Sequence, residues 1–260
     1  MLKKNLKLIL EYLNLDLVKK DRNKKILNEL EQSISMLNFL KLAKQSNVKE
    51  IIKKMHKSKS QLAQDIFVLD QLNFMKKGFF VEFGACDGLY LSNTHLLEKE
   101  YNWNGIVCEP AKIFYKSLKK NRNCFIENKC VIANNNYNNN KIKFVETNNN
   151  ELSFVKNIAQ GKNVYIKKKI YEVETISINK LLEKYNCPSK FEYLSIDTEG
   201  DEYNIIKNLN FDRYNPRVIT IEHNYETSKR KNIFNLLIKK NYKRIHKDIS
   251  RWDDWYIYKK

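Results

Sequence analysis

The stretch that most constrains the fold is residues 79–88, with the sequence FFVEFGACDG. It begins as an apolar run rich in aromatic and β-branched side chains, which predicts a buried strand of a parallel sheet. It ends in glycine and aspartate, which predict a turn, and residues 89–101 then show the apolar spacing of a helix. A strand, a glycine turn and a helix in this order open a nucleotide-binding α/β domain. The glycines let the backbone approach a ligand, and the helix directs its free amide groups at that ligand.

The spacing of the turn residues narrows the choice of ligand. The motif reads Glu82-x-Gly84-x-x-x-Gly88 and lacks the central glycine that admits a pyrophosphate, which argues against a nicotinamide oxidoreductase. A carboxylate at the strand end suits a ligand with an ammonium group, as in the methionine part of S-adenosylmethionine. Glu109 ends the next apolar run about twenty residues later, where such folds place the carboxylate that binds ribose hydroxyls. An ordinary strand, turn and helix without a ligand is the alternative.

The composition sets limits on the class of protein. The 260 residues are enough for one α/β domain with an appendage, and no apolar run is long enough to span a membrane. The N-terminus lacks the features of a cleaved signal peptide. The five cysteines form no C-x-x-C pair, so we expect reduced thiols in a cytoplasmic protein.

The net charge of +18 has two interpretations. A basic protein of this kind can bind nucleic acid, but such binding needs cationic side chains clustered on one face. Here the lysines are scattered through every segment, and Asn and Ile are also abundant, as AT-rich coding would produce. We therefore favour a compositional origin of the charge and keep nucleic-acid binding as the less favoured alternative.

Residues 1–57 are predicted to form a helical arm or cap, and residues 58–260 a separate catalytic domain. Apolar side chains recur in the arm at helical spacing, in two groups: Leu2, Leu6, Ile9, Leu10, Leu13 and Leu17, and then Ile26, Leu27, Leu30, Ile34, Leu37 and Leu40. The interpretations are a self-association arm that gives a homo-oligomer, a lid over the acceptor site, a contact with an anionic partner, or a cap that covers the sheet.

The remaining pattern predicts further strands and helices. After a linking segment whose helix is capped by Ser60, we expect strands at 124–133, 142–145, 173–178, 191–197 and 217–223, and a hairpin of 242–248 with 254–258. Ligands of doubly wound sheets bind beyond the carboxyl ends of the strands. Polar groups that follow four of these strands should therefore gather there: Gly84–Gly88, Glu109, Asp197–Glu199 and His223–Asn224.

Several of these segments resemble the FkbM family of methyltransferases. The similar segments are 81–88 with 91–94, 103–105 with 108–110, 193–202, 216–224, 253–256, and 60–65. The most specific of them is 193–202, with the sequence YLSIDTEGDE. The resemblance covers roughly residues 58–258 and leaves out the helical arm.

The resemblance implies a class I, Rossmann-like fold that uses S-adenosylmethionine. Such a fold has a seven-stranded sheet, mostly parallel, with one antiparallel strand in the terminal hairpin. The family implies methyl transfer to an oxygen, commonly a hydroxyl of a sugar or of a polyketide-type natural product. The chain departs from the family at Cys86, where a polar residue such as Asn is common.

The cofactor-binding residues follow from the loop and the strand ends. Glu82, Gly84, Asp87 and Gly88 should hold the amino-acid end of S-adenosylmethionine, and Glu109 the ribose. Ser92, Asn93 and Thr94 begin the predicted helix and should bond the cofactor carboxylate or pack the loop. Asp197 should orient the acceptor or bind the methionine end.

Transfer to a neutral hydroxyl also needs a base within hydrogen-bond reach. We prefer His223 because its unperturbed pKa lies near working pH, with Asp197 as the other candidate and a structural imidazole as the alternative for His223. Asp197, Glu199 and Asp201 could hold a divalent cation. We assign no metal, because acidic residues at a helix start are favoured by the helix dipole alone.

These observations predict an S-adenosylmethionine-dependent O-methyltransferase acting on a hydroxyl of a sugar, glycan or natural product. Two alternatives stay open at this point. One is an RNA-directed methyltransferase that uses the basic arm as a clamp, although no Asn/Asp-Pro-Pro-Tyr signature is present. The other is a catalytically silent scaffold that oligomerises through the arm.

Overall fold

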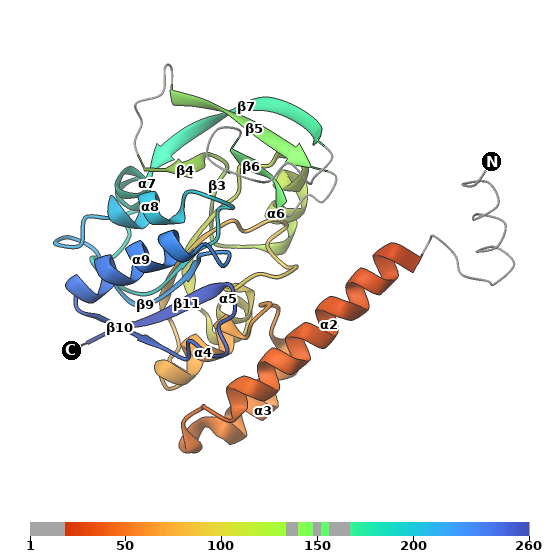
Figure 1. Cartoon of the computed structure of the whole chain (residues 1–260), viewed down its shortest axis with the longest axis vertical. Coiled ribbons are helices and arrows are strands. Elements are labelled where there is room, and N and C mark those ends of the chain that lie inside the picture. The colour runs from red at the N-terminus through yellow and green to blue at the C-terminus, as the bar shows by residue number, and fades with distance from the viewer. Residues whose placement is uncertain (1–18, 134–139, 148–151, 156–166, 260) are drawn as a thin grey trace, which may run out of the picture.

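The computed structural model describes residues 19–133, 140–147, 152–155 and 167–259 (Figure 1). A helical N-terminal part precedes a domain in which strands and helices alternate. No helix in the described ranges is both long enough and apolar enough to cross a membrane.

The domain is built on a seven-stranded sheet in the order β10-β11-β9-β8-β1-β2-β3. The strands are β1 (Phe79–Phe83), β2 (Asn104–Cys108), β3 (Phe125–Glu127), β8 (Lys190–Ile196), β9 (Asn215–Glu222), β10 (Tyr242–Ile245) and β11 (Asp253–Tyr258). Strands β3, β2, β1, β8 and β9 are parallel, whereas β11 runs antiparallel to both β9 and β10. The predicted mixed sheet with a terminal hairpin is confirmed. The chain reverses its winding between β1 and β8, which is where a doubly wound sheet binds its ligand.

Helices cover both faces of this sheet. One face packs against α7 (Ile178–Lys184), α8 (Glu202–Lys207) and α9 (Thr227–Lys239), and the other against α4 (Gln64–Gln71), α5 (His95–Tyr101) and α6 (Tyr115–Asn121). The alternation of side chains along a strand assigns residues to faces. Val81 and Phe83 belong to the first hydrophobic core, and Phe80 belongs to the second. Glu82 therefore lies on the face that carries α4, α5 and α6.

The described part of the N-terminal arm is helical, as predicted. It comprises α2 (Lys19–Leu40), α3 (Val48–Lys54) and the short 3-10 turns η1 (Gln45–Asn47) and η2 (Met55–Lys57). Its C-terminal half is anchored to the domain, because Met36, Phe39 and Ile51 are buried in the same core as α4 and α5. The first apolar group of the arm, residues 2–17, lies outside the described residues. The boundary at residue 57 stays a prediction.

A second sheet, which the sequence pattern did not predict, lies beside the first (Figure 1). Its order is β4-β7-β5-β6, with β4 (Cys130–Ile132), β5 (Lys141–Thr147), β6 (Phe154–Val155) and β7 (Lys167–Ser177). The single strand expected at 124–133 is wrong. The chain breaks at residues 128–129, and its two halves, β3 and β4, join different sheets.

Two local predictions are also wrong. The helix expected at 89–101 begins only at His95, because residues 84–94 form a loop with left-handed backbone at Gly84, Cys86, Gly88 and Leu91. Ser60 does not cap the next helix. The residue before α4 is Ala63, which itself adopts a left-handed conformation, and the Ser60 hydroxyl donates to Asp65.

Candidate active site

A pocket of about 360 Å³ lies at the carboxyl ends of β1, β2, β8 and β9. Its wall includes Glu82 and Glu109, the two carboxylates whose spacing defined the predicted nucleoside site. Strands β1 and β2 pair in parallel with Glu82 opposite Val107, so both carboxylates reach the pocket from neighbouring strand ends. Phe144 and Val155 of the second sheet contribute an apolar wall. The pocket is thus enclosed between the two sheets.

Gly84 is required where it stands. Its φ is +81°, and a Cβ there would lie 1.8 Å from the carbonyl oxygen of Asp197. The backbone of the β1 turn therefore passes directly against the end of β8, and any side chain at position 84 would push the two strand ends apart. This contact holds two lining residues of the pocket, Gly84 and Asp197, against each other.

Glu109 holds a buried carboxylate at the end of β2. One oxygen accepts from the amide of Cys86 at 2.9 Å, and the other accepts from the amide of Ala111 at 2.7 Å. Burial raises the pKa of Glu109 to about 7, against the lowering effect of these two bonds, and the charge of Asp197 raises it further. Each carboxylate oxygen has a second lone pair, so Glu109 keeps acceptor capacity for ligand hydroxyls.

Glu82 is the centre of a buried hydrogen-bond network. Its carboxylate accepts from the Ser92 hydroxyl, from the Asn93 amide at 2.7 Å and from the Thr94 hydroxyl at 2.5 Å. Arg122 lies 3.3 Å from the same carboxylate. The predicted contact of Glu82 with a ligand ammonium would have to be made in addition to these bonds. Its role in the structure is to hold the loop 92–94.

Arg122 is the residue of this network that sequence reasoning missed. It is buried, it binds Glu98 at 2.6 Å and Glu82 at 3.3 Å, and it donates to Thr94 at 2.8 Å. Burial alone would raise the pKa of Glu98, but the charge of Arg122 lowers that pKa to about 2. Arg122 directly follows the lysine-rich helix α6, and nothing in the sequence there indicates a buried ion pair.

Replacing Arg122 with methionine is expected to reduce the free energy of unfolding by about 3–5 kcal/mol, because it removes the cation from the buried carboxylate of Glu82 and leaves that of Glu98 with the partly exposed Lys99. The midpoint of thermal unfolding should fall by roughly 6–20 °C. Arg213→Met is the matched control, since Arg213 pairs with Glu183 on the exposed surface, and it should cost about 1 kcal/mol or less. Equal losses in the two variants would contradict the network.

Four of the predicted cofactor residues do not line the pocket. Asp87 caps the loop by accepting from the amides of Leu89 and Tyr90. A Cβ at Gly88 would collide with Arg122. Ser92 and Thr94 are bonded to Glu82. Their placement makes the loop rigid, and direct contact with the cofactor stays a prediction for all four.

Of residues 92–94, Asn93 is the one that lines the pocket. Its side chain is 8% exposed, and its amide nitrogen donates to the Ser195 hydroxyl at 3.0 Å. The side-chain oxygen, Oδ1, has no hydrogen-bond partner within the part of the chain that the structure describes. A buried acceptor without a donor is costly, so a ligand N–H or O–H is the natural partner for this atom.

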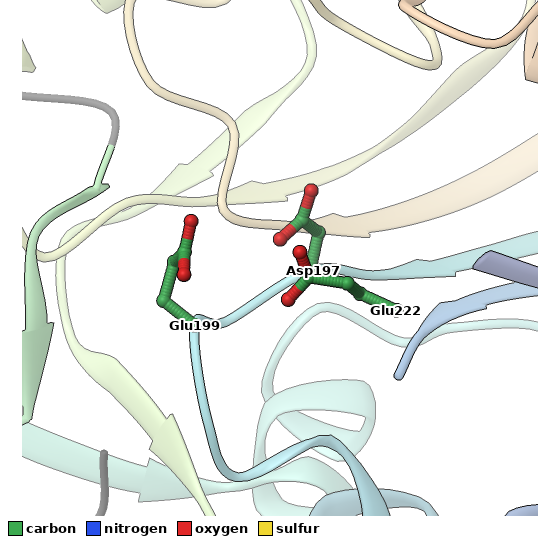
Figure 2. Close-up of side chains that lie close together, drawn as sticks. All are labelled: Asp197, Glu199 and Glu222. Atoms are coloured by element: carbon green, nitrogen blue, oxygen red, sulfur yellow. The ribbon is translucent and has the colours of Figure 1, made fainter. Parts of the chain in front are cut away.

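Three carboxylates of the pocket wall lie close together: Asp197 and Glu199, which follow β8, and Glu222, which ends β9 (Figure 2). Their ligand atoms lie within 4.8 Å of one another. The sequence analysis had grouped Asp201 with Asp197 and Glu199. The structure places Asp201 elsewhere, where it accepts from Asn204 and from the amide of Ala133.

The loop that carries Asp197 and Glu199 is fixed by Glu202. This buried side chain accepts from the amide of Thr198 at 3.1 Å and from the amide of Gly200 at 2.7 Å, and Lys229 of α9 neutralises it at 2.8 Å. Of the acidic residues that follow β8, Asp197 and Glu199 therefore line the pocket, whereas Glu202 holds the loop in place.

His223 does not reach the pocket. The imidazole is fully buried, Nδ1 accepts from the amide of Tyr225 at 3.0 Å, and Nε2 faces Asp254 at 3.9 Å. Burial lowers the pKa of His223, partly offset by Asp254. Its neighbours Glu222 and Asn224 line the pocket instead. This arrangement argues against His223 as the base and favours the structural alternative.

Asp253 is a further buried carboxyl beside the site that sequence reasoning did not assign. Gln64, which lines the pocket, donates to it at 2.8 Å. Burial, reinforced by the charge of Asp197, raises the pKa of Asp253 to about 8. The pair joins α4 to the terminal hairpin at the edge of the pocket.

The sheet order and the pocket at its switch point define a Rossmann-like α/β fold of the class that binds nucleotides at this place. The family model described as "Methyltransferase FkbM domain" matches residues 82–254. The chain therefore belongs to the FkbM family of methyltransferases, and S-adenosylmethionine is its methyl donor. No curated protein matches the chain.

Solved structures with a similar fold have low sequence identity. A methyltransferase FkbM from Methylobacillus flagellatus KT has 10% identity and a TM-score of 0.46, with 86% of this chain and 58% of that chain covered. This chain thus spans less than two thirds of that protein. A precorrin-6y C5,15-methyltransferase from Geobacter metallireducens GS-15 has 10% identity and a TM-score of 0.40, with 69% and 71% covered. A chain of a fibrillarin/Nop5p complex has 12% identity and a TM-score of 0.39, with 77% and 81% covered.

The residues of the pocket fit the donor. Glu109 offers acceptor capacity at the end of β2, and Asn93 Oδ1 has no donor among the described residues. A nucleoside with hydroxyl and ammonium donors and a positive sulfonium suits a wall made of oxygen acceptors and carboxylates.

Proposed function

We propose that this methyltransferase acts on a hydroxyl oxygen of an uncharged acceptor, a sugar, a glycan or a natural product. The donor supplies a methyl group already activated on a sulfonium. The protein has to hold the acceptor oxygen in line with that methyl group, exclude water, and take up the hydroxyl proton. The observation that carries the proposal is the pocket wall, which joins apolar side chains of the second sheet to carboxylates at the ends of β8 and β9.

Asp197 is the base that this geometry favours. It follows β8 at the switch point of the sheet, it lines the pocket, and its charge reaches both Glu109 and Asp253. A carboxylate at that place can accept the hydroxyl proton as the new oxygen–carbon bond forms. Glu199 and Glu222 keep the local potential negative, which favours the approach of a proton donor.

The charge of the pocket disfavours RNA as the acceptor. Among the described residues, the wall carries the carboxylates Glu82, Glu109, Asp197, Glu199 and Glu222 and no Lys or Arg side chain. A polyanion is bound through cationic contacts to its phosphates, and such contacts are missing from these described walls.

The experiment that tests the proposal is incubation with methyl-labelled S-adenosylmethionine and matched acceptors. The panel contains free sugars and oligosaccharides, the corresponding nucleotide-sugars, and RNA. Label should enter an uncharged carbohydrate or natural-product hydroxyl as an ether that is stable to mild base. Label in RNA alone, or in an amine, would contradict the proposed acceptor class without contradicting the family.

A further inference from the structure

Helix α2 has two faces of different character. Ser35, Met36 and Phe39 are buried against the domain. On the other side five aliphatic side chains are about half exposed: Ile26 (51%), Leu27 (60%), Leu30 (54%), Ile34 (48%) and Leu37 (56%). At 3.6 residues per turn these five positions fall within an arc of about 100°. We call this set the aliphatic stripe.

The aliphatic stripe faces away from the domain. On the other side of α2, Asn28 bonds to the Tyr90 hydroxyl and Gln32 donates to the carbonyl of Lys59, and Figure 1 shows α2 running along the edge of the domain. Soluble proteins rarely leave a contiguous aliphatic surface in water unless it serves an interaction. The stripe is therefore a docking surface, and its spacing identifies the kind of partner.

The spacing is that of a helix–helix seam. Leu27, Leu30, Ile34 and Leu37 follow one another at intervals of three, four and three residues, which is the alternation of core positions in a coiled coil. A second helix with the same spacing can pack against such a seam, because each of its apolar side chains fits between side chains of the first helix.

We propose that the aliphatic stripe of α2 pairs with the same stripe of a second copy of this chain. A two-fold contact needs a self-complementary surface, and a seam of alternating aliphatic residues meets that requirement. The stripe is only about 17 Å long, so the interface lies at the small end of specific contacts. The dimer should therefore dissociate on dilution rather than be obligate.

The charges beside the stripe distinguish this partner from a lipid surface. Glu29 and Glu31 lie on opposite flanks of the stripe, near its middle, and Glu31 pairs with Arg251 of the domain at 2.9 Å. A helix that binds anionic lipid carries Lys or Arg at such positions, next to its apolar face. A second protein helix tolerates the exposed carboxylate of Glu29 at its flank because that carboxylate stays in water.

Pairing would also act on the active site. Asn28, next to Leu27 in the chain, lines the pocket, and its side-chain amide bonds to the Tyr90 hydroxyl. The face of α2 opposite the stripe thus forms part of the pocket wall. A second copy that holds the arm in place would steady that wall.

Sedimentation equilibrium of the full chain between about 1 and 200 µM tests the proposal by mass action. The wild-type mass should rise from 31.1 kDa toward twice that value. Leu30→Lys and Ile34→Lys should each weaken the dimer at least about tenfold, because pairing would then bury two ammonium groups. The matched control is Ile238→Lys on α9, where the side chain is 40% exposed; it should dimerise as the wild type does.

Two results would overturn the proposal. One is a wild-type chain that stays monomeric at the highest concentration, whether it floats with phosphatidylserine vesicles or not. The other is a dimer that Leu30→Lys and Ile34→Lys leave unchanged. Thermal unfolding of each variant checks that it is folded. Because mass is the readout, the outcome is independent of the acceptor proposed above.

Discussion

Replacing Asp197 with asparagine is expected to reduce the turnover number about 100- to 10,000-fold, the usual contribution of a positioned general base. Asparagine keeps the shape of the side chain but has no basic oxygen that can take the hydroxyl proton. The affinity for S-adenosylmethionine should change little, because Glu109 and the Gly84 turn lie on the neighbouring strands. Single-turnover transfer of labelled methyl, together with calorimetric binding of the cofactor, separates the two effects.

The control for Asp197→Asn is His223→Gln. The imidazole is buried outside the pocket wall, so this variant should lose stability but keep most of its turnover per folded molecule. The reverse pattern, with turnover lost in His223→Gln and kept in Asp197→Asn, would return the base to His223.

Replacing Glu109 with glutamine is expected to weaken S-adenosylmethionine binding about 10- to 150-fold, which corresponds to about 1.5–3 kcal/mol for hydrogen bonds to a charged group. The turnover number at saturating cofactor should fall much less, because Glu109 is proposed to bind the ribose rather than the reacting atoms. Calorimetry gives the affinity directly. Glu174→Gln removes the same charge from an exposed side chain, 59% accessible, and should leave the affinity unchanged.

The same carboxylate predicts a pH dependence of cofactor binding. The pKa of Glu109 is about 7 without ligand, above its ordinary value. The carboxylate form, which accepts the ribose hydroxyls best, is therefore lost as pH falls through 7. The affinity for S-adenosylmethionine should decline below that pH by up to about tenfold per pH unit. In Glu109→Gln the affinity should depend much less on pH. A wild-type affinity that rises on acidification would contradict the assignment of Glu109.

The raised pKa of Glu109 has the opposite effect on the stability of the fold, which decreases as pH rises. In the folded chain Glu109 binds its proton more tightly than in the unfolded chain, so the folded state holds more protons between the two pKa values. Its contribution to stability is therefore present below the unfolded value of about 4.5 and is lost as pH rises toward 7. Asp253, with a pKa near 8, acts in the same direction.

The central sheet could be predicted from sequence because its strands are short, apolar and flanked by turn residues. Strands β1, β2, β8 and β9 are mostly runs of buried residues, and such runs are recognisable without long-range information. The predicted strands at 142–145 and 173–178 are present as parts of β5 and β7, but nothing local indicated that they pair with each other in a second sheet. β3 and β4 are separated by two residues, and nothing local indicates that they part into different sheets.

Most of the polar strand ends that the sequence grouped line one pocket, because the carboxyl ends of parallel strands meet at one edge of a sheet. The roles within it depended on contacts that a sequence does not contain. Glu82 and Arg122 are forty residues apart, yet they lie 3.3 Å from each other. His223 and Glu222 are neighbours in the chain, and alternation along β9 turns only one of them into the pocket. Whether a polar residue binds a ligand or another side chain is decided by such placement.

The most direct test of the account is a structure of the protein bound to S-adenosylhomocysteine. The account predicts that the ribose hydroxyls lie about 3 Å from the Glu109 carboxylate, with the sulfur directed toward Asp197 and the chain backbone at Gly84 against the ligand. A nucleoside bound elsewhere, with side chains of the protein filling the space between Glu109 and Asp197, would contradict it.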